Sequence, residues 1–162
     1  MGEHLPPADE AMEPQRMRDR PTWLISRAYA RATGLLQEGF AADGDRLRSY
    51  HYRLLAALDE RGPASQAALG RGTGIDRSDV TAALVELEER GLVERNVNPA
   101  DRRRNVVSIT AAGTSRLAEL DTVVDKIQER LLAPLSADER RQFITLIRRI
   151  ADGGQGLRAR PP

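Results

Sequence analysis

A run of positive charge is the feature of this sequence with the clearest chemistry. Arg102, Arg103 and Arg104 are consecutive and follow Asp101, within a segment, 98–105, that begins with an Asn-Pro turn signal. Because asparagine and proline favour turns, this segment is expected to be a loop that presents its charges outward. Arginine is also the side chain best suited to a narrow minor groove of DNA. A solvated loop is the plainer interpretation of any charge run, but a position between two β-like runs favours contact with DNA.

A helical pattern N-terminal to the arginines carries a second set of polar groups. Asp76 is a good N-cap, Val80, Leu84 and Leu87 recur at helical spacing, and Gly91 supplies the left-handed residue that ends a helix. One face is therefore expected to be buried. The first two turns of the opposite face carry short or cationic residues suited to base edges, whereas the glutamates further along would be repelled by phosphate. The predicted base readers are Arg77, Ser78, Thr81 and Ala82.

The neighbouring segments complete a winged helix-turn-helix. A shorter helix is expected from about Ser65 to Gly70, followed by a turn at residues 72–74. The N-terminus of that helix, at Ser65 and Gln66, is expected to contact the phosphate backbone. Alternating apolar residues after the second helix predict two strands, one on each side of the arginine loop. This order of elements places one helix in the major groove and a basic loop beside it.

The run from Gly91 to Gly113 resembles the MarR family of winged-helix transcriptional regulators. Its hallmarks are Gly91-Leu92-Val93 before the wing, Asp101 with Arg103 within it, and Ile109-Thr110 with Gly113 after it. The resemblance extends over roughly residues 23–152. It implies that the wing aspartate holds an arginine in shape while a wing arginine enters the minor groove. Thr73 departs from the family pattern, because a leucine-like residue is common in that turn.

Helical patterns lie on both sides of this central segment. One is expected to start at Pro21 and break at 41–45, and another runs from about Arg46 to Asp59. After the wing, Thr110 is expected to cap a long helix that ends before Pro134. Its apolar residues have the three-four spacing of a coiled-coil seam: Leu117, Leu120, Val124, Ile127 and Leu131.

A capping box at Ser136–Glu139 predicts a last helix, whose apolar stripe is Phe143, Leu146, Ile147 and Ile150. These outer helices have two interpretations. They pack within one chain, or they interlock with a second copy. The second is preferred, because a two-fold dimer matches a palindromic operator with half-sites about 10 bp apart.

The sequence also leaves open a ligand pocket around the helix at 46–59. His51 lies on the apolar face of the helix at 46–59, where a hydrogen-bonded core histidine is the plainer interpretation. The alternative is a pocket formed by Trp23, Arg27, His51 and Tyr52. The family resemblance implies such a pocket for phenolic or aromatic carboxylate ligands. A carboxylate would pair with Arg27, Arg31 or Arg53, although each is more often solvated surface.

Composition narrows the possible functions. The chain has 162 residues, a net charge of +1, no cysteine, and only two histidines, His4 and His51. Cysteine-based redox sensing and thiolate metal sites are thereby excluded, and no metal site, cofactor or catalytic residue is predicted. No apolar run is long enough to span a membrane, and no signal peptide is recognised, so a cytoplasmic location without membrane contact is expected. An enzyme is not indicated.

The sequence therefore predicts a mainly α fold with a small β wing (α+β): a winged helix-turn-helix with N- and C-terminal dimerisation helices. The expected divisions are a disordered tail at 1–20, a dimerisation helix at 21–45, a DNA-binding domain at 46–110, further dimerisation helices at 111–152 and a flexible tail at 153–162. The expected function is a homodimeric repressor that binds double-stranded DNA and is released by a small aromatic acid effector. The alternative is a winged-helix module that binds protein, with neither specific DNA binding nor ligand response.

Overall fold

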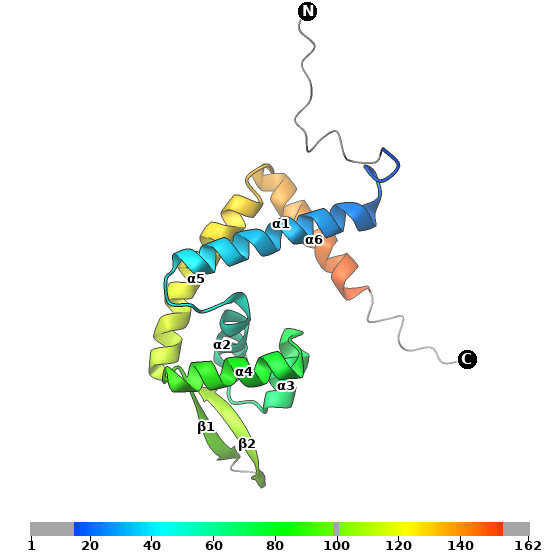
Figure 1. Cartoon of the computed structure of the whole chain (residues 1–162). Helices are drawn as coiled ribbons and strands as arrows, with labels where there is room; N and C mark the ends of the chain where they lie inside the picture. The colour runs from blue at the N-terminus through cyan, green and yellow to red at the C-terminus, as the bar shows by residue number, and fades with distance from the viewer. Residues whose placement is uncertain (1–14, 99–100, 154–162) are drawn as a thin grey trace, which may run out of the picture.

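The computed structural model describes residues 15–98 and 101–153 and consists of six helices and one hairpin in those ranges (Figure 1). Most of both predicted tails lies outside the described residues. The elements in chain order are α1 (Pro21–Ala42), α2 (Ser49–Arg61), α3 (Gln66–Thr73), α4 (Arg77–Glu89), β1 (Val93–Asn98), β2 (Asp101–Ile109), α5 (Ala111–Leu131) and α6 (Ala137–Asp152). This is the predicted mainly α fold with a small β wing. None of the described helices is both long and apolar enough to cross a membrane.

The core is built around α2, which packs against α3, α4, α5 and β2. Leu54 and Leu55 of α2 are fully buried, as are Leu84 and Leu87 of α4 and Leu120 of α5. Burying side chains of this size is the main favourable contribution to folding. The helix that carries the predicted base readers is therefore held in the core along its whole apolar face.

Two helix boundaries differ from the prediction. α2 begins at Ser49 and not at Arg46, because Arg46 has φ 57 and Arg48 is an extended N-cap, so neither has helical backbone. α3 continues through residues 72–73 and ends only at Gly74, which has the left-handed φ of 66. The predicted turn at 72–74 was thus placed two residues too early. The hydroxyl of Thr73 donates to the carbonyl of Leu69 at 2.7 Å, which holds that last helical turn closed.

The hairpin of β1 and β2 is antiparallel and projects from the lobe formed by α2, α3 and α4 (Figure 1). Val93 pairs with Ile109, and Asn98 pairs with Asp101. The prediction of a loop over 98–105 was wrong at Asn98, which ends β1, and from Asp101 onward, where the backbone is strand. Only two residues separate the strands, so the consecutive arginines belong to β2 and not to the connection. The side chains of 97–105 lie outside the described part of the structure.

The apolar stripe of α5 is buried inside a single subunit. Leu117, Leu120 and Ile127 have exposed fractions of 6%, 0% and 3%, and α5 packs against α1 and α2. A Cβ on Gly39 of α1 would overlap the side chain of Ile127, so the two helices approach closely at that glycine. α1 and α2 therefore cover these three residues within one subunit, whereas Val124 and Leu131 are only partly buried, and the dimerisation role predicted for 111–152 stays a prediction.

α6 has the predicted capping box but no buried residue. Ser136 Oγ accepts from the backbone of Glu139, and the Glu139 carboxylate accepts from the backbone nitrogen of Ser136 at 2.8 Å. The Ser136 bonds also lower the pKa of Glu139. The large apolar residues of this helix are nevertheless exposed: Phe143, Ile144, Leu146 and Ile150.

Candidate nucleic-acid interface

The interface is built on α4, whose two faces have opposite character. Val80, Leu84 and Leu87 are fully buried, which confirms the predicted inner face. The predicted base readers Arg77, Ser78, Thr81 and Ala82 are all exposed. Asp76 has the extended backbone of an N-cap, but its side chain makes no capping hydrogen bond, contrary to the prediction. The helix position is therefore set by packing and not by its cap.

Side-chain bonds fix α3 relative to its neighbours. Ser65 is the N-cap of α3, as predicted, and its hydroxyl accepts from the backbone nitrogen of Ala68 at 3.3 Å. Gln66, the first residue of α3, donates from Nε2 to the hydroxyl of Thr81 on α4. At the other end, Arg53 of α2 donates to the carbonyl of Thr73 at 3.2 Å. Although Thr73 departs from the family pattern, its side chain and its carbonyl both form hydrogen bonds, which hold the end of α3 in place.

The base of the wing explains the spacing of the residues around it. Gly91 has φ 68, the left-handed conformation that ends α4. The Thr110 hydroxyl donates to the carbonyl of Gly91 at 2.7 Å and accepts from the nitrogen of Gly113 at 3.0 Å. A Cβ on Gly113 would overlap the carbonyl oxygen of Leu92. Only glycine fits there, because the start of α5 lies directly against the chain that enters β1.

The wing is also joined to the core of the lobe. Val107 of β2 exchanges two backbone hydrogen bonds with Ala64, at 2.9 and 3.0 Å. Arg95 of β1 pairs with Glu88 of α4, Nε to Oε2 at 2.8 Å. The hairpin is thereby fixed relative to α4. The backbone of the wing candidates Asp101, Arg102, Arg103 and Arg104 continues along β2 toward the far end of the hairpin.

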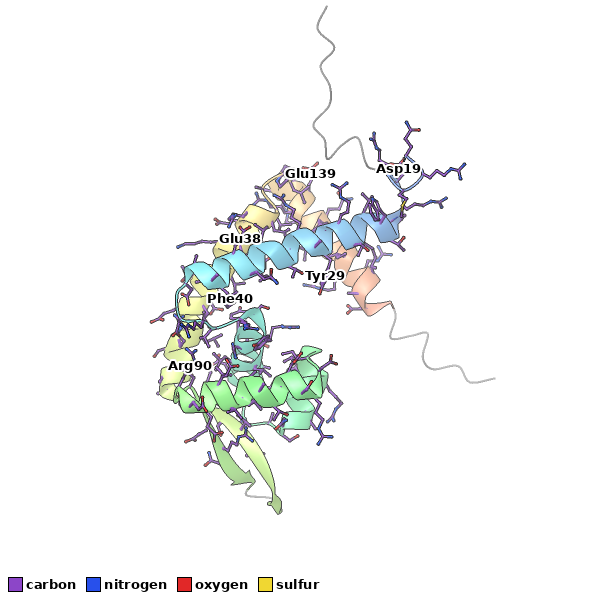
Figure 2. The ribbon with its side chains drawn as sticks, viewed as in Figure 1. Asp19, Tyr29, Glu38, Phe40, Arg90 and Glu139 are labelled. Carbon is purple, nitrogen blue, oxygen red and sulfur yellow. The ribbon has the colours of Figure 1, made fainter. Side chains whose placement is uncertain are left out.

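A cavity of about 950 Å³ lies between α1, α2 and α5. Tyr29, which points from α1 toward the lobe (Figure 2), contributes to its lining. Of the four predicted pocket residues, Tyr52 lines it, whereas Trp23, Arg27 and His51 are not among its lining residues. The other residues of the lining are Thr33, Leu36, Gln37, Phe40, Ala41, Gly44, Arg46, Leu47, Arg48, Ser49, Tyr50, Arg53, Val124 and Gln128.

His51 is a core residue beside this cavity. Its side chain is fully buried, and Nδ1 accepts from the backbone nitrogen of Arg48 at 2.9 Å. Burial lowers its pKa to about 4, against the opposing effect of Glu86 on α4. His51 is therefore neutral at pH 7 with its proton on Nε2, which lies 3.2 Å from Oε2 of Glu86. That distance is close enough for attraction, but the geometry is not that of a hydrogen bond.

Tyr52 has its hydroxyl proton committed to α5. The hydroxyl donates to Oδ1 of Asp121 at 2.9 Å, and its ring lies 6.4 Å from that of Phe40. Burial, together with Asp121, raises the pKa of Tyr52 to about 12. Tyr52 therefore stays neutral and links the wall of the cavity to α5.

A family model described as MarR family matches residues 46–104. The transcriptional repressor NicR of Pseudomonas putida is 31% identical over 132 residues, which is 82% of each chain. The chain belongs to the MarR family. A structure of BpsR of Bordetella bronchiseptica is similar to this chain, with a TM-score of 0.76 and 26% identity over 86% of this chain and 99% of that one. That structure addresses the regulation of BpsR DNA binding by 6-hydroxynicotinic acid. The repressor CouR of Rhodococcus jostii RHA1 bound to a 23-mer DNA duplex gives TM-score 0.77 and 26% identity, covering 86% and 98%.

This MarR-family chain joins the loop between α1 and α2 to the recognition helix α4. Arg90, the C-cap of α4, donates from Nη1 to the backbone oxygen of Asp45 at 2.8 Å and to its Oδ1 at 2.9 Å. Arg116 of α5 pairs with Asp43 and, through Nε at 3.2 Å, with Asp45. Its third carboxylate partner is Glu119 at 2.6 Å.

Sequence reasoning missed this cluster. The segment 41–45 was recognised only as a helix break. Arg90 and Asp45 are separated by 45 positions, and Arg116 and Asp43 by 73, so no local pattern relates them. The excess of arginine over lysine gave no signal either, because it is spread over the whole chain.

Proposed function

We propose that this MarR-family regulator is a homodimeric repressor that binds a palindromic operator and is released by a small aromatic acid. The observation that carries the proposal is the division of α4 into a fully buried face and an exposed face of short and cationic residues. Such a face suits the major groove, where base edges differ in their donors and acceptors. The transcriptional role itself follows from the family.

The DNA contacts are assigned by position on this scaffold. Arg77, Ser78, Thr81 and Ala82 read base edges, and the N-terminus of α3 at Ser65 and Gln66 lies on the phosphate backbone. The wing arginines Arg102, Arg103 and Arg104 enter or flank the minor groove, with Asp101 holding one of them in position. With a net charge of only +1, DNA affinity depends on how these charges are distributed.

A second copy covers α6 and the first turns of α1. Large apolar side chains are exposed on both helices, with exposed fractions of 49% for Leu24, 46% for Leu146 and 61% for Ile150. Exposed apolar side chains gathered on a helix in this way are typical of an interaction site. In this assignment the apolar stripe of α5 belongs to each subunit's own core, and α6 and part of α1 contact the other subunit. A two-fold dimer then places its recognition helices on half-sites about 10 bp apart.

The effector occupies the cavity between α1, α2 and α5. Its lining combines aromatic rings with Arg46, Arg48 and Arg53, and a guanidinium can bind a carboxylate with two parallel hydrogen bonds. The relatives named above support a small aromatic acid, because 6-hydroxynicotinic acid regulates DNA binding by BpsR. A structure of CouR holds p-coumaroyl-CoA, so effectors larger than a free acid are also represented in the family.

Release of DNA is proposed to act through the loop at 43–48. Residues of this loop line the cavity, and Asp45 of the same loop holds Arg90 at the end of α4. An occupant that displaces the loop changes the position of α4 in each subunit. Because only one separation of the two recognition helices matches the operator, an effector that favours another separation lowers DNA affinity by its differential binding free energy.

Footprinting on the DNA that flanks its own gene tests the proposal. We expect two protected half-sites about 10 bp apart, and loss of protection with 6-hydroxynicotinic acid or another member of a panel of aromatic acids. Benzene derivatives without an acid group are the matched controls. If the protein protects none of the flanking DNA in footprinting and shifts none of it in gel electrophoresis, the repressor assignment is contradicted. Protection that no panel member reverses contradicts only the effector.

A further inference from the structure

Thr81, on the exposed face of α4, has its hydroxyl group engaged by the protein itself. Its Oγ1 donates to the carbonyl oxygen of Arg77 at 2.8 Å, and the same oxygen accepts from Nε2 of Gln66. A hydroxyl has one proton, and here the Arg77 carbonyl receives it. The group of Gln66 that faces Thr81 must therefore be the amide nitrogen and not the amide oxygen. The orientations of both side chains are fixed by this pair of bonds.

Because the hydroxyl of Thr81 is already hydrogen-bonded, the methyl is the group that remains available to contact a base. To read a base acceptor it would have to withdraw its proton from Arg77, which leaves a carbonyl bond unmade. Its oxygen is engaged by Gln66 of α3 and by the Arg77 carbonyl, so Cγ2 is the heavy atom on Cβ that makes no hydrogen bond. Arg77 and Ser78, on the same face, form no side-chain hydrogen bond with another described residue and keep their polar groups available.

Thymine is the base with an apolar group on its major-groove edge, the C5 methyl. We propose that Thr81 selects thymine at one position of each half-site through its methyl group, and that Gln66 is the positioning residue that turns the methyl outward. The inference rests on the proposed function, in which α4 enters the major groove. The second N–H and the Oε1 of Gln66 stay free for a phosphate or a neighbouring base, so its expected backbone contact is retained.

Two substitutions separate the methyl from the hydroxyl. Thr81→Val keeps a methyl in place, since valine in a helix has one strongly preferred rotamer, and removes the hydroxyl. Thr81→Ser keeps the hydroxyl and removes the methyl. A polar reading by Thr81 would be preserved in the serine variant and lost in the valine variant. A methyl reading predicts the reverse.

The test uses the full chain and a site selected from random duplex DNA, in which each thymine is then replaced by uracil to remove its methyl. For the parent and Thr81→Val, we expect one replacement in each half-site to weaken binding about four-fold, the value of one buried methyl. For Thr81→Ser, the same replacement should have no effect. Gln66→Ala should relax the thymine preference at that position, whereas Gln15→Ala, at an exposed glutamine before α1, should not.

The failures are distinguishable. A parent chain that selects no duplex overturns the DNA-binding proposal and this inference together. A selected site at which Thr81→Ser keeps the thymine preference and Thr81→Val loses it overturns the methyl assignment and leaves DNA binding intact. Gln66→Ala with unchanged base preference but weaker binding at every sequence makes Gln66 a phosphate contact only, which overturns its positioning role.

Discussion

Arg90 and Asp45 join the end of the recognition helix to the loop that lines the cavity. The Arg90 guanidinium binds both the backbone oxygen and the carboxylate of Asp45, at 2.8 and 2.9 Å. His51 makes a second connection between the same regions, because it accepts from the nitrogen of Arg48 and faces Glu86 of α4. The loop at 43–48 therefore contacts Arg90 at the end of α4 directly, and it is linked through His51 of α2 to Glu86 in the last turn of α4.

Arg90→Ala tests the first of these connections. We expect operator affinity to fall by up to about five-fold, equivalent to the roughly 1 kcal/mol that a partly exposed ion pair contributes. Arg130→Ala is the matched control, since it removes an exposed pair with Glu38 between α5 and α1 without touching α4. Equal affinities for the two variants, measured by fluorescence anisotropy, would show that the link does not position the helix.

Arg102→Ala and Arg103→Ala test the wing. Each should weaken operator binding at physiological salt and reduce the slope of log affinity against log salt by about 1 for each subunit of the dimer, because each subunit loses one phosphate-neutralising charge. Lys126→Ala, which removes an exposed cation of α5, should leave the slope unchanged. If both wing variants bind as tightly as the parent, the wing does not contact DNA.

Gly113→Ala should destabilise the fold. The added Cβ overlaps the carbonyl oxygen of Leu92, and relieving that overlap costs about 1–3 kcal/mol. Gly34→Ala is the control, because nothing lies within 4 Å of a Cβ at that helical position. It should stabilise the chain by about 0.5–1 kcal/mol through helix propensity. Urea unfolding of both variants measures the difference, and equal free energies of unfolding contradict the close approach at Gly113.

His51 makes stability depend on pH. Burial lowers the pKa of His51 in the folded state to about 4, below its ordinary value of 6.5, so between these two pH values the unfolded chain binds the additional proton. The free energy of unfolding should therefore fall as pH drops from about 6.5 toward 4, by at most about 3 kcal/mol from this residue. His51→Gln, which retains an acceptor for Arg48, should remove this part of the pH dependence. Parallel stability curves for parent and variant between pH 7 and 5 would contradict it.

Leu146→Glu and Ile150→Glu test the dimer. Both side chains are exposed in the single subunit, so a charge there leaves the fold intact but must be desolvated in a dimer interface. We expect both variants to sediment as monomers with an unchanged circular dichroism spectrum. Val85→Glu, on an exposed apolar residue of α4, is the control and should sediment like the parent. If Leu146→Glu and Ile150→Glu sediment as dimers like the parent, α6 is not in the interface, and a parent chain that sediments as a monomer contradicts the homodimer.

Local pattern determined a large part of this molecule. The stripe of Val80, Leu84 and Leu87 predicted the buried face of α4, since side chains at helical spacing share one face whatever they pack against. Gly91 predicted the end of that helix, because its left-handed φ of 68 suits glycine. Three short motifs together indicated the family from the sequence alone: Gly91-Leu92-Val93, Asp101 with Arg103, and Ile109-Thr110 with Gly113.

Tertiary structure decided what these elements pack against. The spacing of the apolar stripe on α5 is the same whether a second copy or the chain's own α1 and α2 cover it. Periodicity therefore does not distinguish packing within one chain from packing between two chains. The placement of His51 beside the cavity, and not within its lining, depends on how α2 packs against α4. The bonds from Arg90 to Asp45 and from Arg116 to Asp43 join segments far apart in sequence. Such contacts form only when the helices pack. Secondary-structure propensity and residue spacing are signals over a few residues, whereas these ion pairs join residues far apart in the sequence.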